Sequence, residues 1–302
     1  MKGMVNYMEK KRKLVFCGGD RRLIYCAERF ADAGDECLIW RGESGTEDKN
    51  VMRVRDLRQA CENADAVIMS IPAFTGGGKL ICTDDGRSCV DCEYIFEKLP
   101  ASVDIFGGKF AAIVKRVAAE YNHSLTDYAV LEEFGILNAI PTAEAAVEIA
   151  MSRLKKTLWD SSVTVLGYGR IGRTLTKRLL ALGANVTVAA RSAAALAAAE
   201  SDGAAVCGLS HWLRAPERFD VCYNTVPCQI VGEECVAACA EGIFIDLASA
   251  PGGFTDEARS LLGDRLIIAL SLPGKYSPET AGTIIYKTVN GLLRSGKRGG
   301  AQ

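Results

Sequence analysis

A glycine-rich segment in the second half of the chain has the residue types and spacing of a dinucleotide-binding turn. Gly167, Gly169 and Gly172 form the pattern G-x-G-x-x-G directly after the apolar run 163–166, and leucines at helical spacing follow. In such a turn the first glycine allows a tight bend, the second lets the backbone approach a pyrophosphate, and the third allows a helix to pack closely on a strand. The dipole of that helix attracts the phosphates. The predicted cofactor contacts here are Gly167, Tyr168, Gly169, Arg170, Ile171 and Gly172.

The residues after the next predicted strand indicate which dinucleotide is bound. Arg191 and Ser192 follow the strand 185–190, where a site for NAD usually carries Asp or Glu to bind the ribose hydroxyls. A guanidinium and a hydroxyl instead suit a 2′-phosphate. The alternative is that Arg191 is only a solvated charge in a loop. We predict NADP as the cofactor.

Three loops after later strands supply further candidate contacts, because ligands bind at the carboxyl ends of a parallel sheet. They are residues 224–227, 246–253 and 272–282, and each could also be an ordinary turn. Lys275 could provide a cation for a substrate carboxylate. The predicted cofactor contacts in these loops are Asn224, Thr225, Val226, Pro227, Asp246, Leu247 and Ala248. The predicted substrate contacts are Ser249, Gly274 and Lys275.

No residue is assigned as the catalytic acid or base. The chain has two histidines, His123 and His211, and neither sits in the Arg/Glu/His pattern of the 2-hydroxy-acid dehydrogenases. We expect His211 to lie on a surface helix. The C-x-x-C formed by Cys89 and Cys92 has no second Cys or His pair at zinc-site spacing, so no metal site is predicted.

Alternating strand and helix patterns predict the elements that carry these residues. We expect an α/β fold with two Rossmann-like, doubly wound parallel-sheet domains and an interdomain cleft. The expected domains are residues 1–140, on the substrate side, and residues 141–278, which bind NADP. A long helix from about Pro141 to Lys156 would join them, and the last helix, within 279–296, would pack back on the first domain. The predicted strands are residues 14–17, 36–40, 66–71, 103–106, 163–166, 185–190, 220–224, 243–247 and 266–270.

Composition narrows the classes of function. Lys plus Arg total 36 and Asp plus Glu total 37 in 302 residues, so the chain has no broad electrostatic field to hold nucleic acid or an anionic membrane. Many of its 12 cysteines lie in apolar strand or helix patterns, as reduced, buried thiols do. The N-terminal stretch lacks the apolar core of a signal peptide. We expect a cytoplasmic enzyme that binds neither nucleic acid nor membranes.

Several segments together resemble one known family. They are the opening Gly18–Arg22, residues 140–144, the Gly167 turn with its Arg191 strand end, and residues 246–253 and 272–282. On these the chain resembles the A subunit of dipicolinate synthase from about residue 13 to residue 295. The joint occurrence of the last two segments is more specific than the glycine pattern. The second half is more distantly similar to alanine dehydrogenase and the 2-hydroxy-acid dehydrogenases.

The resemblance implies oxidation of a dihydrodipicolinate to the aromatic dipicolinate with NADP⁺, alongside the B subunit of dipicolinate synthase, during endospore formation. A dicarboxylate substrate requires cations, and Arg21, Arg22, Lys109 and Lys275 are available. Of these, Arg21, Arg22 and Lys275 are predicted substrate contacts. We also expect a homo-oligomer. Two alternatives are another NADP-linked dehydrogenase of an imine, amino or hydroxy acid, and a non-catalytic NADP-binding protein that regulates a partner.

Overall fold

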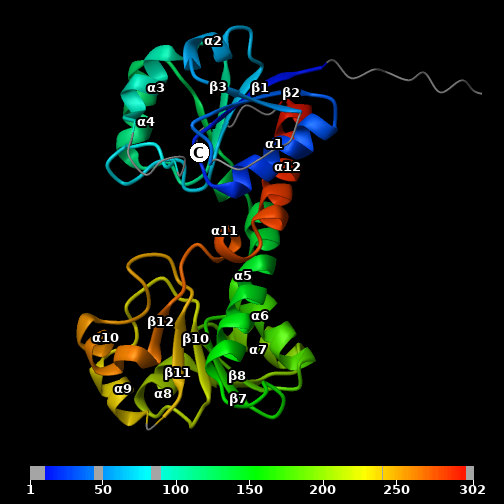
Figure 1. Ribbon diagram of the computed structural model, residues 1–302. Coiled ribbons are helices and arrows are strands. Elements are labelled where there is room, and N and C mark those ends of the chain that lie inside the picture. Colours follow the sequence, from blue (N-terminus) through cyan, green and yellow to red (C-terminus); the bar gives the residue numbers. More distant parts are fainter. Residues whose placement is uncertain (1–10, 44–49, 83–89, 240, 297–302) are drawn as a thin grey trace, which may run out of the picture. The chain divides into compact units, whose positions relative to one another are not determined.

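The computed structural model describes residues 11–43, 50–82, 90–239 and 241–296. The chain falls into two compact units (Figure 1): unit 1 comprises residues 1–135 and 278–302, and unit 2 comprises residues 136–277. Each unit contains a six-stranded parallel sheet flanked by helices, which confirms the prediction of two Rossmann-like α/β domains. Cys89 of the C-x-x-C pattern lies outside the described residues.

The sheet of unit 1 has the strand order β3-β2-β1-β4-β5-β6, which is the order of a dinucleotide-binding fold. Its strands are β1 (Lys13–Cys17), β2 (Glu36–Trp40), β3 (Val51–Val54), β4 (Ala66–Met69), β5 (Asp104–Gly107) and β6 (Leu125–Asp127). The helices of this unit are α1 (Arg21–Asp32), α2 (Leu57–Cys61), α3 (Cys92–Lys98), α4 (Ala112–Glu120), the short 3₁₀ helix η1 (Tyr128–Val130) and α12 (Pro278–Ser295).

Buried apolar side chains on both faces of the central strands hold the unit 1 sheet between its helices. β1 pairs in parallel with β2 and β4, and residues 14–17 of β1 are fully buried. A strand covered on both faces is a continuous apolar run, which is why this one is recognisable in the sequence. The buried Tyr128 hydroxyl donates to the Met69 carbonyl at 2.9 Å, so this polar group in the core is also satisfied.

The last helix, α12, packs against α1 in unit 1 (Figure 1). Phe30 of α1 and Tyr286 of α12 meet edge to face, with ring centroids 4.7 Å apart. Gly282 lies where the two helices approach closely, because a Cβ atom there would be 2.7 Å from the Cβ of Tyr25. The helix pair therefore depends on a residue without a side chain at this point.

The sheet of unit 2 has the order β12-β11-β10-β7-β8-β9, which repeats the topology of unit 1 when counted from β9. Its strands are β7 (Ser162–Leu166), β8 (Asn185–Ala190), β9 (Ala205–Gly208), β10 (Val221–Asn224), β11 (Ile243–Asp246) and β12 (Leu266–Ile268). The helices are α5 (Glu132–Arg153), which begins in unit 1, α6 (Arg170–Ala181), α7 (Ala193–Ser201), α8 (Leu209–Arg214), α9 (Glu233–Ala238), α10 (Asp256–Leu262), the 3₁₀ helix η2 (Gly263–Arg265) and α11 (Leu272–Tyr276).

The prediction that the long helix starts near Pro141 is wrong, because α5 begins at Glu132. Proline is most common in the first turn of a helix, yet Pro141 lies inside this one and removes one backbone donor. Nearby, the Thr142 hydroxyl donates to the Asn138 carbonyl at 2.8 Å. Among the described residues, α5 is the one helix long and apolar enough to cross a membrane, and 56% of its apolar window is buried within the protein.

We predict that Gly282→Ala destabilises the α1–α12 packing. The new methyl group would overlap α1, so the free energy of unfolding should fall by about 1–3 kcal/mol. Gly291→Ala is the matched control, because it adds the same methyl group to α12 where no other atom lies within 4 Å. The control should be neutral or stabilising by up to about 1 kcal/mol. Urea denaturation followed by circular dichroism measures both, and equal midpoints would contradict the close packing.

Candidate functional site

The three glycines between β7 and α6 have different structural roles. Gly167 has a φ of +90°, and a Cβ atom there would lie 2.6 Å from the hydroxyl of Thr225. A Cβ atom on Gly172 would overlap the carbonyl oxygen of Gly167. At Gly169, by contrast, no neighbouring heavy atom of the described chain lies within 4 Å of the Cβ position. The fold itself requires the first and third glycines, whereas the second borders space that a ligand can enter.

The space beside Gly169 lies at the N-terminus of α6. This helix has 12 residues, and its N-cap is Gly169, so no side chain caps it. The first-turn N–H groups of a helix have no partner within the helix and carry partial positive charge. An open glycine turn at such a terminus accommodates a pyrophosphate. The residues of this turn therefore fit the phosphates of a dinucleotide.

The equivalent turn of unit 1, between β1 and α1, is closed. A Cβ atom on Gly18 would lie 2.6 Å from the carbonyl oxygen of Ile81 and 2.9 Å from the Leu80 side chain. The Gly19 N–H donates to the same Ile81 carbonyl at 2.6 Å. Residues 80–81 therefore lie against both glycines, and the Ile81 carbonyl occupies a backbone donor of this turn.

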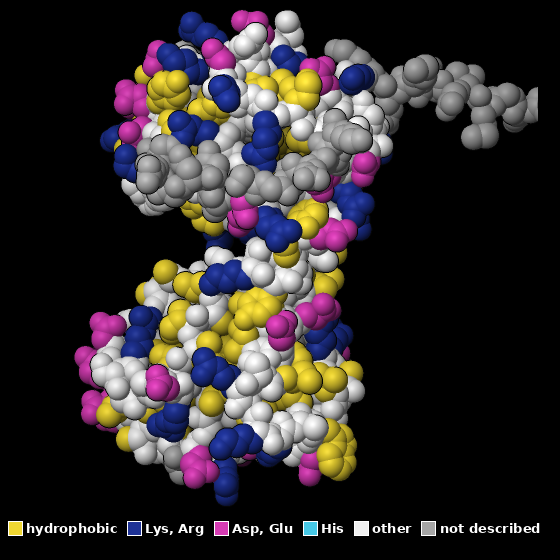
Figure 2. Space-filling model, viewed as in Figure 1, with side chains coloured by type: hydrophobic (Ala, Val, Ile, Leu, Met, Phe, Trp, Pro, Cys, Tyr) yellow, Lys and Arg dark blue, Asp and Glu magenta, His cyan; other side chains and the backbone are white. Residues whose placement is uncertain are grey.

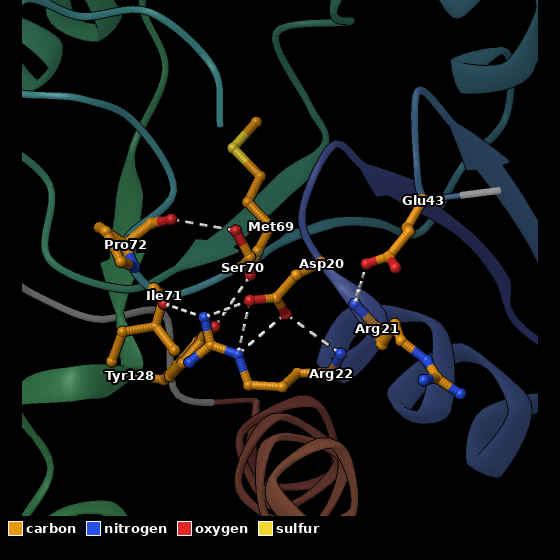
Figure 3. Close-up of polar contacts among 9 residues, drawn as sticks. All are labelled: Asp20, Arg21, Arg22, Glu43, Met69, Ser70, Ile71, Pro72 and Tyr128. Atoms are coloured by element: carbon orange, nitrogen blue, oxygen red, sulfur yellow. Dashed lines mark hydrogen bonds and ion pairs between the residues drawn. The ribbon is translucent and has the colours of Figure 1, made fainter. Parts of the chain in front are cut away.

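Side chains of the protein also occupy the N-terminus of α1 (Figure 3). Asp20 caps the helix by accepting from the Arg22 N–H at 3.1 Å, and Glu43 accepts from the Arg21 N–H at 3.0 Å. The Arg22 guanidinium is buried, where it donates to Asp20 at 2.8 Å and to the Ile71 carbonyl at 2.7 Å. Arg22 thus ties the start of α1 to the end of β4.

The residues predicted to bind substrate differ in exposure. Arg21 is exposed, whereas the neighbouring Arg22 is only 7% exposed. Lys275 is exposed on α11, Gly274 is half-buried beside it, and Ser249 is exposed in the loop after β11. Contacts of these residues with a substrate stay predictions, and Arg22 could make one only in addition to its bonds within unit 1.

A buried carboxylate organises the loops at the carboxyl ends of β10 and β11. Asp246, 1% exposed, accepts from the Asn224 side-chain amide at 2.8 Å, the Ala248 N–H at 3.1 Å and the Gly253 N–H at 2.9 Å. Asn224 is fully buried, and its amide oxygen accepts from the Val226 N–H at 3.1 Å. Both side chains therefore form their hydrogen bonds within the protein, and these bonds fix the backbones of the predicted cofactor loops.

Two further features hold the loop 247–253. Gly253 passes so close to Asn224 that a Cβ atom would overlap the amide nitrogen, and Gly252 has a φ of +84°. Arg259 of α10 donates to the Pro251 carbonyl at 2.7 Å. Leu247 and Ala248 are buried at the base of the loop, so its accessible part begins at Ser249. On the loop 224–227, the Thr225 hydroxyl donates to the Leu166 carbonyl at 2.8 Å, and Pro227 is exposed.

Arg191 and Ser192 lie where the sequence placed them, at the end of β8. Both are exposed. The Ser192 hydroxyl accepts from the Ala195 N–H at 3.1 Å and so caps α7. This bond uses a lone pair of the hydroxyl, and its proton can still be donated to a phosphate oxygen. The pair therefore offers a cation and a hydroxyl donor at the strand end.

Asp202 also belongs to this region, although it was not predicted from the sequence. It accepts from the Tyr168 hydroxyl at 2.7 Å and forms ion pairs with Arg173 at 3.3 Å and Lys177 at 3.2 Å. Burial, and then the bond to Asp202, raise the pKa of Tyr168, while the Tyr168 hydroxyl and Lys177 lower the pKa of Asp202. These contacts anchor the tyrosine ring of the glycine turn. The sequence contains no local pattern that pairs Tyr168 with a residue 34 positions further along the chain.

The two histidines lie in different environments. His123 is buried, with Nε2 2.9 Å from the Phe96 carbonyl oxygen. His211 is exposed on α8, as expected. No group of three or more potential metal ligands occurs among the described residues. Lys and Arg side chains are interspersed with Asp and Glu over the visible face of each unit (Figure 2).

Two family models match the chain. Residues 13–129 match the N-terminal domain of the dipicolinate synthase A subunit, and residues 142–237 match the NAD binding domain of D-isomer specific 2-hydroxyacid dehydrogenases. The two matches fall in unit 1 and unit 2, respectively. The second includes the Gly167–Gly172 turn and the Arg191 strand end.

Known relatives cover most of the chain. It is 31% identical over 233 residues to the A subunit of dipicolinate synthase of Bacillus subtilis (strain 168), covering 77% of this chain and 78% of that protein. The crystal structure of the same protein from Bacillus halodurans has a TM-score of 0.84 and 26% identity, covering 93% of this chain and 97% of that one. The crystal structure of the Bacillus subtilis protein has the same TM-score and identity, covering 97% and 100%.

We predict that Gly169→Val abolishes binding of a nicotinamide dinucleotide and leaves the fold intact. The side chain would fill the open space that the pyrophosphate needs, without meeting another atom of the described chain. Gly172→Ala should behave in the opposite way, lowering the melting temperature because its methyl group overlaps Gly167. Cofactor titration and circular dichroism measure both effects. Normal cofactor binding by folded Gly169→Val would show that the site is elsewhere.

Proposed function

The chain belongs to the family of dipicolinate synthase A subunits, and we propose that it oxidises a dihydrodipicolinate to dipicolinate with NADP⁺. Its relationship to this family and its NAD-binding dehydrogenase domain support an NAD(P)-linked, dehydrogenase-like role. The observation that carries the proposal is the open Gly169 turn at the N-terminus of α6, in a chain with these relatives.

The proposed reaction balances without a further reactant. Bound NADP⁺ would accept a hydride from a ring C–H bond of the dihydropyridine, and loss of a ring proton would complete the conversion to dipicolinate, NADPH and H⁺. Aromatisation of the ring provides the driving force. The chain's own residues have to bind two carboxylates, hold the ring in place and keep water from the reacting carbon.

Rigid loops support this positioning role. The bonds of Asp246 fix residues 224–227 and 247–253 at the sheet edge that carries the glycine turn. We propose that their accessible backbone and Ser249 border the nicotinamide, while the exposed Lys275 and Arg21 contribute cations for the substrate. Asn224 and Asp246 act as positioning residues in this proposal, since their side chains are buried.

Arg191 and Ser192 favour NADP over NAD in the proposal, because an exposed guanidinium and a hydroxyl at the end of β8 can bind a 2′-phosphate. The family relationship further suggests the B subunit of dipicolinate synthase as partner, a dicarboxylate as substrate and a role in endospore formation. A homo-oligomeric, cytoplasmic enzyme is part of the same proposal.

Activity provides the direct test. With NADP⁺ and dihydrodipicolinate, the protein should produce NADPH and dipicolinate in equal amounts, measured by absorbance and chromatography, with and without the B subunit. Turnover of a different imine, amino or hydroxy acid in a substrate panel would favour the broader dehydrogenase alternative. Tight NADPH binding without any turnover, even when the B subunit is present, would favour the regulatory alternative.

The substrate cations are tested in the same assay. Lys275→Met and Arg21→Met should each weaken dipicolinate binding roughly ten- to a hundredfold, the usual effect of losing one charge-assisted hydrogen bond, with NADPH affinity unchanged. Arg116→Met is the matched control, because it removes an exposed cation from α4. Unchanged dipicolinate affinity in both test variants would remove these residues from the substrate site.

We predict that the native protein binds NADPH more tightly than NADH and that Arg191→Asp reverses this preference. Loss of the charge-assisted contact with the 2′-phosphate costs about 1.5–3 kcal/mol, or roughly ten- to a hundredfold in affinity. The new carboxylate would repel the phosphate and can accept hydrogen bonds from the ribose hydroxyls of NADH. Fluorescence titration with both cofactors is the measurement, and equal affinities in the native protein would refute the assignment.

A further inference from the structure

A guanidinium with a buried, unsatisfied donor lies at the edge of the unit 2 sheet opposite the glycine turn. Arg265 ends η2, directly before β12. Its Nη1 atom is buried and has no hydrogen-bond partner in the described part of the chain, although the residue as a whole is half-buried rather than enclosed. A desolvated guanidinium is unfavourable unless an acceptor or a negative charge compensates it. None of the ion pairs found among the described residues supplies that charge to Arg265.

Arg265 lines a cavity of about 410 Å³. The cavity lies at the amino ends of β10 and β11, whereas the turn at Gly167 follows the carboxyl end of β7 in the same parallel sheet. Its volume is within the range of small-molecule sites. Besides Arg265, the lining includes the charged residues Arg218, Asp220 and Glu241, together with the ring of Phe219.

The acidic residues of the cavity already have partners. Asp220 accepts from Lys156 Nζ at 2.7 Å and from the Ser162 N–H at 2.8 Å. Glu241 lies 3.6 Å from Arg218 in an ion pair whose side chains are 87% (Arg218) and 78% (Glu241) exposed. Such an exposed pair contributes little stability, so Arg218 can exchange it for another anion. Among the charged residues of the cavity lining, Arg265 therefore has no carboxylate partner, and Arg218 is available to bind an anion.

We propose that this cavity binds a small molecule through an oxyanion group, a carboxylate or a phosphate, which is held by Arg218 and by the accessible part of the Arg265 side chain, whose Nη1 atom is itself buried. Guanidinium groups bind both anions through paired N–H donors, and the Phe219 ring offers an apolar wall for the rest of the ligand. The site is separate from the proposed cofactor turn, so its ligand would not compete with the dinucleotide. Binding there would stabilise unit 2 and makes the cavity a candidate effector site.

The test compares melting temperatures of the full chain in inorganic phosphate and in chloride at matched ionic strength. At concentrations well above its Kd, phosphate bound in this cavity should raise the melting temperature of the native protein by about 2–4 °C. This increase should be absent in Arg265→Gln. Phosphate at the N-terminus of α6 would shift both proteins equally and so cancels in the difference. A second series with pyridine-2,6-dicarboxylate shows whether the preferred oxyanion is a carboxylate.

Arg116→Gln in unit 1 is the matched control and should respond like the native protein. Arg265→Lys keeps the charge without the paired donors, so its response should be reduced. It also serves as the test if Arg265→Gln is not folded by circular dichroism. A shift that depends on Arg265 with either anion supports the site. Equal shifts in the native protein and the Arg265 variants, with both anions, would overturn it.

Discussion

A buried carboxylate has to be surrounded by donors, and the carboxyl-end edge of unit 2 is organised around that requirement. Asp246 receives one side-chain and two backbone hydrogen bonds, and each fixes a different stretch of loop. An unsatisfied buried polar group costs about 1–3 kcal/mol, and a charged group costs more. Any loop arrangement that broke these hydrogen bonds would carry that cost, so the loops keep a single arrangement. The close approach of Gly253 to Asn224 belongs to that arrangement, because Asp246 accepts hydrogen bonds from both residues.

The two units share a strand order yet differ at the same topological position. In unit 1 the first turn is covered by residues 80–81, and Asp20 and Glu43 occupy the N-terminus of its helix. In unit 2 the corresponding helix begins at Gly169 with no side-chain cap. Topology alone therefore does not make a dinucleotide site, because the outcome is decided by what lies next to the second glycine and the first helical turn.

The sequence identified most of the buried central strands and missed several strands at the sheet edges. Strands 36–40 and 185–190 have the predicted bounds, whereas β3, β6 and β9 lie at sheet edges and contain no fully buried residue. The glycine turn was predictable because its spacing is local. The opposite exposures of Arg21 and Arg22 were not, since adjacent helical residues point about 100° apart and only the packing of α1 decides which is buried.

The return of α12 to unit 1 has a consequence for biosynthesis. The apolar face of α1, including Phe30, is completed by residues 278–295, which leave the ribosome only after all of unit 2. During translation, unit 2 is contiguous and can fold as soon as it has emerged, whereas unit 1 must wait with a hydrophobic surface uncovered. Chains truncated before residue 278 would therefore expose that surface and be prone to aggregate, even though their nucleotide-binding half is complete.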